Sequence, residues 1–91
     1  MSLYRLEIPK PVQKQIDALP GRYRQRVKRI IGDLRHTPRP PTAEPLRAFV
    51  ERYRIRVDDY RIVYHIDDDI LVIEVVKVGR KHGPEFYDDI A

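Results

Sequence analysis

Alternation of side chains over two neighbouring segments is the feature that most constrains how this chain can fold. Residues 53–57 alternate aromatic or β-branched side chains with arginines, and in residues 60–66 a similar apolar set alternates with Arg61, Val63 and His65. A period of two predicts strands with one buried face, and Asp58-Asp59 between the segments is typical of a tight hairpin turn. The next segment, Ile70–Val78, is almost wholly apolar and follows the acidic turn Asp67–Asp69. It therefore predicts a central strand that is covered on both faces.

The first half of the chain predicts one short strand and two helices. Residues Leu3–Ile8 are rich in strand-forming types. From Pro11 to Leu19 the apolar residues recur at helical spacing, and Pro20-Gly21 ends that helix. A second apolar stripe at helical spacing runs from Tyr23 to Leu34. Because almost no chain separates the two segments, we expect an antiparallel helical hairpin.

These elements predict an α+β fold in the order β-α-α-β-β-β, with the helical hairpin packed on one face of a small antiparallel sheet. The segment His36–Pro45 contains four prolines and is interpreted as a stiff connector. The segment Pro84–Ile90 predicts a short C-terminal helical turn. A chain of 91 residues suffices for one domain, which we place at residues 1–91.

The composition narrows the class of protein. Cysteine is absent, which excludes disulfides and cysteine-bound zinc. No apolar run approaches the roughly 20 residues that a membrane span requires, so we expect a soluble, cytoplasmic protein without a membrane partner. The net charge is +4, and 13 of the 18 basic residues are arginine. Arginine binds phosphate through a planar fork, so a nucleic-acid partner and an ordinary charged surface both stay open.

The alternation places three arginines on one face of the predicted hairpin. A two-residue turn at Asp58-Asp59 sets Arg56 directly opposite Arg61, with Arg54 on the same face. Like charges opposite each other destabilise a sheet unless an anion lies between them. The pattern therefore predicts an anion site, and the alternative is that the arginines pair with acidic residues of the chain. His65 lies further along the same face.

A second group of basic residues follows the third predicted strand. Arg80, Lys81 and His82 stand between Gly79 and Gly83, and glycine allows the backbone to turn over a sheet face. Tyr87 comes shortly afterwards and offers a ring on which a base can stack.

Several motifs together resemble one family. They are the segment Tyr53–Tyr64, an acidic turn, an apolar strand, the step Val78–Lys81, and Tyr87. In this combination the chain resembles RelE-type toxins of the RelE/ParE superfamily of toxin–antitoxin systems, over nearly its whole length. The resemblance implies an endoribonuclease that enters the ribosomal A site and cuts translated mRNA. It also implies that no metal or other cofactor is needed, and that a cognate antitoxin holds the toxin inactive.

The resemblance implies a role for each matching residue. Arg54 and Arg56 stand at basic positions that are often lysine in the family. Arg61 is expected to hold the scissile phosphate, and Lys81 is expected near the leaving group. Tyr87 is expected to stack on the base or to assist proton transfer.

Further residues complete the predicted site. Arg80 and His82 are expected to bind RNA. Arginine is a very poor general base because its guanidinium group stays protonated at physiological pH. The candidates for the general base are therefore His82, His65 and Tyr87.

Two other functions share this fold. One is a ParE-like toxin that inhibits DNA gyrase, and the other is a binding module without catalysis. The combination of Arg54, Arg56 and Arg61 with Tyr87 favours the mRNA interferase.

Overall fold

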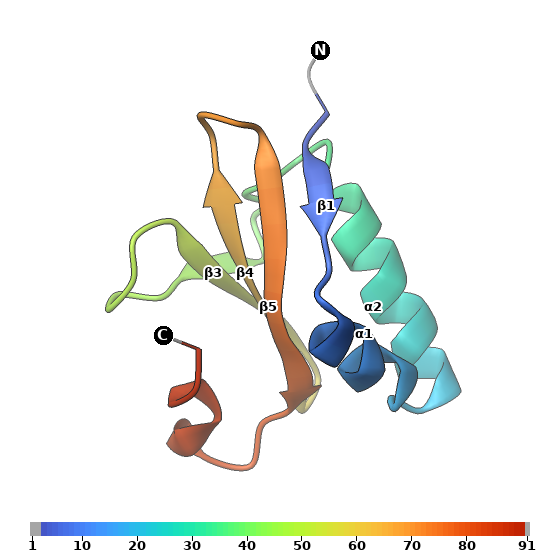
Figure 1. Ribbon diagram of the computed structural model, residues 1–91. Coiled ribbons are helices and arrows are strands. Elements are labelled where there is room, and N and C mark those ends of the chain that lie inside the picture. Colours follow the sequence, from blue (N-terminus) through green and yellow to red (C-terminus); the bar gives the residue numbers. More distant parts are fainter. Residues whose placement is uncertain (1–2, 91) are drawn as a thin grey trace.

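A five-stranded sheet forms the centre of the computed structural model, which describes residues 3–90 (Figure 1). The strand order across the sheet is β1-β5-β4-β3-β2. Both helices lie on one side of the sheet, and the C-terminal segment lies on the other (Figure 1). In chain order the elements are β1 (Arg5–Glu7), α1 (Lys10–Asp17), α2 (Gly21–Asp33), β2 (Ala43–Pro45), β3 (Arg52–Val57), β4 (Tyr60–Asp67), β5 (Val72–Arg80) and the 3₁₀ helix η1 (Pro84–Tyr87).

The predicted α+β class is confirmed, together with the N-terminal strand, the helical hairpin and the C-terminal turn. Two details differ. The sheet is mixed, because β1 pairs in parallel with β5, as a crossover through helices permits. The proline-rich connector also contains a fifth strand, β2, which pairs with β3 at the sheet edge. Pro45 is tolerated there because an edge strand leaves one row of backbone groups unpaired.

The register of the central hairpin is the predicted one. Val57 pairs with Tyr60, Ile55 with Ile62, and the two arginines Arg56 and Arg61 face each other. The apolar face of this hairpin packs on the helices and forms the main core. Its buried members include Val12, Ile16, Val27, Ile31, Ile55, Ile62, Tyr64, Ile73 and Val75. Over residues 3–90, no helix combines the length and apolarity that crossing a membrane requires.

An irregularity in β5 changes which side chains face the outer side of the sheet. Val63 pairs with Lys77 while Tyr64 pairs with Val75, so Val76 is an extra residue in β5. Such a bulge interrupts the alternation of side chains. Val76 contacts the small cluster on the outer face, and because of the bulge Lys77 reaches that side as well. The strand thus has apolar contacts on both faces, as its composition predicts.

The second, smaller core lies on the outer face, beneath the C-terminal segment. Val63, Phe86 and Ile90 are its buried members, and Leu46 and Phe49 pack beside them. Phe86 sits over Gly79, where an added methyl group would lie 3.4 Å from the ring. This small core holds η1 against the sheet and thereby positions Tyr87.

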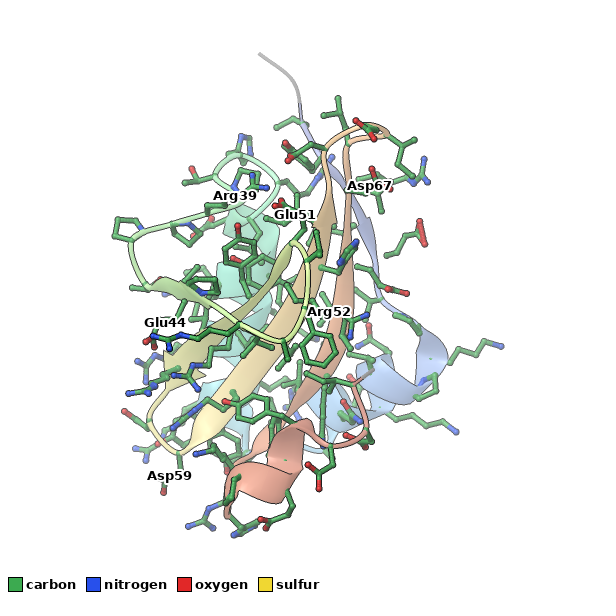
Figure 2. All side chains as sticks on the ribbon, turned by 90° about the vertical axis from the view of Figure 1, so that its left-hand side faces the viewer. Arg39, Glu44, Glu51, Arg52, Asp59 and Asp67 are labelled. Carbon is green, nitrogen blue, oxygen red and sulfur yellow. The ribbon has the colours of Figure 1, made fainter. Side chains whose placement is uncertain are left out.

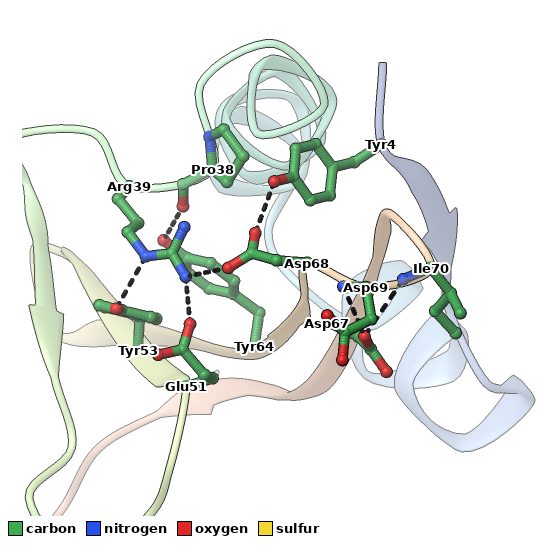
Figure 3. A network of polar contacts seen from close by, with 10 residues as sticks. All are labelled: Tyr4, Pro38, Arg39, Glu51, Tyr53, Tyr64, Asp67, Asp68, Asp69 and Ile70. Carbon is green, nitrogen blue, oxygen red and sulfur yellow. Dashed lines mark hydrogen bonds and ion pairs between the residues drawn. The ribbon is translucent and has the colours of Figure 1, made fainter. Parts of the chain in front are cut away.

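A polar network at the other end of the sheet connects three loops (Figure 3). The Arg39 guanidinium donates to Tyr53 Oη at 2.9 Å, to Asp68 Oδ2 at 2.8 Å and to the carboxylate of Glu51. Asp68 also accepts a hydrogen bond from Tyr4 Oη at 2.5 Å. Arg39 therefore ties the connector to β3 and to the β4–β5 turn, and Tyr4 adds the N-terminal segment.

Replacing Arg39 by methionine is expected to lower the free energy of unfolding by about 1–2 kcal/mol, because it removes two ion pairs and one hydrogen bond. The change corresponds to a fall of about 5–10 °C in Tm for a domain of this size. Arg39, and after it Tyr4, holds the pKa of Asp68 below its ordinary value. That stabilisation is complete above an ordinary aspartate pKa of about 3.9 and disappears as the pH falls through the lowered pKa.

Thermal melting between neutral and acid pH tests the network. The wild type should lose stability more steeply below about pH 4 than the Arg39→Met variant. Arg5→Met is the matched control, because Arg5 forms an exposed ion pair with Glu7 at 3.3 Å. Equal melting of the Arg39 variant and the control would show that the network adds nothing to stability.

Candidate nucleic-acid interface

The predicted arginine cluster lies on the outer face of the sheet. Arg54 and Arg56 are two residues apart on β3, and Arg61 is opposite Arg56 on β4. Arg56 is exposed, whereas the side chain of Arg54 is 23% exposed. This face lies opposite the helices and turns toward the viewer in Figure 2. The structure thus brings three guanidinium groups to one open surface.

The C-terminal segment adds an aromatic ring and an ammonium group to this surface. Arg54 Nη1 donates to Tyr87 Oη at 3.3 Å, and its guanidinium lies 5.9 Å from the centre of that ring. Lys81 Nζ lies 5.9 Å from the same ring centre. The hydrogen bond that Arg54 donates to Tyr87 raises the pKa of Arg54, so this guanidinium stays charged. Two of the predicted site residues, Arg54 and Lys81, therefore lie close to a third, Tyr87.

Arg61 is held by the hairpin turn. Its Nη1 donates to the backbone carbonyl oxygens of Asp58 at 2.8 Å and of Tyr60 at 2.9 Å. The Nε atoms of Arg61 and Arg54 are both buried and have no hydrogen-bond partner within residues 3–90. The turn thus fixes Nη1 of Arg61, while the Nε donors of Arg54 and Arg61 have no hydrogen-bond acceptor within residues 3–90.

The remaining predicted residues lie at the rim of the cluster or away from it. Arg80 is exposed, and its Nη2 lies 3.5 Å from Asp59 Oδ2. His82 is exposed in the loop after β5. His65 is four residues beyond Arg61 on β4, about 13 Å at the rise of a strand, and pairs with Arg52 and Glu74. The structure therefore does not bring His65 together with the arginine cluster.

Glu44 is a member of the cluster that sequence reasoning missed. It lies on β2 opposite Arg54, and its carboxylate oxygens are 3.6 Å from Arg54 Nη2 and 3.4 Å from Arg56 Nε. Figure 2 shows it at the sheet edge among nitrogen-bearing side chains. No signal in the sequence places this residue, because it belongs to a segment interpreted as a connector.

Lys77 holds the C-terminal segment that carries Tyr87, and sequence reasoning missed this residue as well. Its Nζ donates to the backbone carbonyl of Phe86 at 2.6 Å and to Asp89 Oδ1 at 2.8 Å. The same nitrogen lies 4.1 Å from the centre of the Phe86 ring. A lysine within a largely apolar strand was the available signal, because a half-buried ammonium needs a partner.

Lys77→Met is expected to loosen η1 while leaving the main core intact, since methionine keeps the apolar stem and removes the ammonium. The amide hydrogens of Phe86 and Asp88 bond to Gly83 and Glu85 within this segment. Their exchange should accelerate about 10-fold, which corresponds to about 1.4 kcal/mol. Hydrogen exchange followed by NMR measures this, with Lys10→Met as control. Unchanged exchange at Phe86 would show that Lys77 does not hold the segment.

The chain matches the family described as "ParE toxin of type II toxin-antitoxin system, parDE" over residues 6–83. It is 27% identical over 88 residues to the mRNA interferase toxin RelE of Escherichia coli K12, covering 94% of this chain and 92% of the relative.

Solved structures of similar proteins share the fold. A mutant of the E. coli toxin RelE in the free state aligns with a TM-score of 0.81 at 25% identity, over 99% of this chain and 95% of that one. The RelE–RelB complex from Pyrococcus horikoshii aligns with a TM-score of 0.74 at 26% identity, over 88% and 97%. Because the family match covers most of the chain and the fold agrees, the chain belongs to the ParE toxin family, within the RelE/ParE superfamily of type II toxin–antitoxin systems.

Proposed function

We propose that this chain is a toxin that cleaves mRNA on the ribosome and that the outer-face cluster is its active site. The observation that carries the proposal is that Arg54 and Lys81 both lie close to the Tyr87 ring. Arg56 and Arg61 lie on the same face of the sheet. Cations that surround an aromatic ring suit a single-stranded polynucleotide, because the phosphates bind the cations and a base stacks on the ring. The similarity to proteins named mRNA interferases supports the same function.

The proposed reaction is an internal phosphoryl transfer in the RNA. The 2′-oxygen loses its proton and forms a bond to the adjacent phosphorus, while the bond from phosphorus to the 5′-oxygen breaks. The products are a 2′,3′-cyclic phosphate and a 5′-hydroxyl group. Arg61 is proposed to stabilise the negative charge that grows on the phosphate oxygens, and Lys81 to protonate the leaving oxygen.

The base that accepts the 2′-hydroxyl proton has two candidates close to this cluster, Tyr87 and His82. Tyr87 is in contact with Arg54, and His82 follows Lys81 directly. We do not retain His65 in this role, because it faces Arg52 and Glu74 further along the sheet.

The proposed protein partner is a cognate antitoxin. The similar structures include complexes of RelE with RelB from E. coli and from Pyrococcus horikoshii. An acidic or amphipathic segment suits the cationic outer face, because opposite charges steer association and an apolar side chain can cover Phe49 or Val76.

A gyrase-inhibiting toxin of the same family is the second candidate, and the family description itself names ParE. Both candidates predict growth arrest when the chain is induced without an antitoxin. We expect new mRNA ends within coding regions of translated messages, mapped by sequencing of RNA ends. Purified protein should cleave mRNA on ribosomes and leave gyrase supercoiling unaffected. Intact mRNA together with inhibited supercoiling would contradict the proposal and favour the gyrase function.

Arg61→Gln is expected to slow single-turnover cleavage on ribosomes by about 10²–10³-fold, because it removes a charge that acts on the transition state. Its stability should stay within about 1 kcal/mol of the wild type. The lost hydrogen bonds to the Asp58 and Tyr60 carbonyls are offset in part by relief of the repulsion from Arg56.

Arg5→Gln is the matched control for Arg61→Gln, since it removes the same charge from β1 at the far edge of the sheet. Its cleavage rate should equal that of the wild type. A large fall in Tm for Arg61→Gln, with cleavage reduced only in proportion to the folded fraction, would assign Arg61 a structural role instead.

A further inference from the structure

The Glu44 carboxylate lies between two guanidinium groups of the proposed RNA-binding face. Its two oxygens are 3.6 Å from Arg54 Nη2 and 3.4 Å from Arg56 Nε. The pairing of β2 with β3 sets Glu44 directly opposite Arg54, so the backbone determines this position. One negative group thus bridges two of the three clustered arginines.

A carboxylate and a phosphate present the same feature to arginine, which is a pair of anionic oxygens that the planar fork can contact. A phosphate that contacts Arg54 Nη2 and Arg56 Nε together therefore takes the place of the Glu44 carboxylate. The two carboxylates of the hairpin turn, Asp58 and Asp59, have other partners. Asp58 accepts from Tyr23 Oη at 2.8 Å on the helix side, and Asp59 pairs with Arg80.

Both contacts of Glu44 are loose enough to be displaced. They are longer than the 2.7–3.2 Å of a direct hydrogen bond, and the side chain is 49% exposed. Ion pairs made by an exposed carboxylate without a direct hydrogen bond are weak. A polyanion that brings several phosphates to the face can therefore replace one carboxylate.

We infer that Glu44 occupies the position of an RNA phosphate between Arg54 and Arg56 and competes with it, so that this residue sets the affinity of the face for RNA. The inference rests on the proposed function, in which this face binds RNA. In the free protein the carboxylate reduces the repulsion among the three arginines. On binding it must leave, and its displacement weakens the complex.

Glu44→Gln tests the inference, because the amide keeps the shape of the side chain and removes the charge. The probe is a short single-stranded RNA with 2′-O-methyl groups, which the proposed reaction leaves intact. Fluorescence anisotropy should show a dissociation constant about 2- to 20-fold lower than that of the wild type, from the loss of two competing ion pairs. The slope of log affinity against log salt should steepen by about 0.7, the value for one more phosphate contact.

Two controls separate a local effect from a change in overall charge. Glu7→Gln makes the same change in net charge on β1, where Glu7 pairs with Arg5, and should change the affinity by less than about 2-fold. In an Arg56→Gln background the gain from Glu44→Gln should shrink, because one of the two competing contacts is already absent. Equal gains from Glu44→Gln and Glu7→Gln would overturn the inference, as would equal or weaker binding by Glu44→Gln.

Two further measurements, RNA cleavage and thermal melting with a second anion, separate the inference about Glu44 from the proposed function. Loss of cleavage by Glu44→Gln at unchanged affinity would overturn the inference and assign Glu44 to proton transfer. Inorganic tripolyphosphate should raise the Tm of Glu44→Gln at lower concentration than it raises that of the wild type. If this result is obtained but neither protein binds or cleaves RNA, the proposed function fails while the anion position at Glu44 stands.

Discussion

The pairing of β3 with β4 across the Asp58-Asp59 turn constrains every other part of the structure. A shift of one residue would turn the apolar side chains to solvent and the arginines into the core. Each buried apolar side chain contributes about 1.5–3 kcal/mol. The repulsion between Arg56 and Arg61 costs an amount comparable to the roughly 0.2–1 kcal/mol of a favourable cross-strand pair. Burial of Ile55 and Ile62 against the helices therefore outweighs the charge repulsion, and the arginines meet on the outer face.

The second determinant of the outer face is the extra residue in β5. Regular alternation after Val75 would direct Lys77 toward the helices. The bulge at Val76 directs Lys77 to the outer side, where its ammonium binds the Phe86 carbonyl and Asp89. The C-terminal segment is thereby seated over Val63, and Tyr87 reaches Arg54. A local irregularity in one strand thus decides where the aromatic part of the candidate site lies.

The elements that depend on periodicity could be predicted from the sequence, including the register that opposes Arg56 and Arg61. The features that depend on single residues could not. Strand β2 has only three residues and ends in proline, so neither alternation nor composition marks it. Without β2, Glu44 has no predicted neighbour. The bulge at Val76 has no sequence signal either. Alternation placed His65 on the face of the arginines, but four residues of strand separate it from Arg61.

Arginine has two different functions in this protein, and the number and strength of its partners separate them. Arg39 donates to the carboxylates of Glu51 and Asp68 and to the Tyr53 hydroxyl, and these contacts hold the proline-rich connector against β3 and the β4–β5 turn. On the outer face the arginines have partners that are neutral, shared or loosely held, namely two backbone carbonyls, the Tyr87 hydroxyl and the bridging carboxylate of Glu44. Such contacts limit the repulsion in the free protein and cost little to exchange, because each exposed pair contributes at most about 1 kcal/mol. A face held together in this way is stable enough to fold and still able to accept a polyanion.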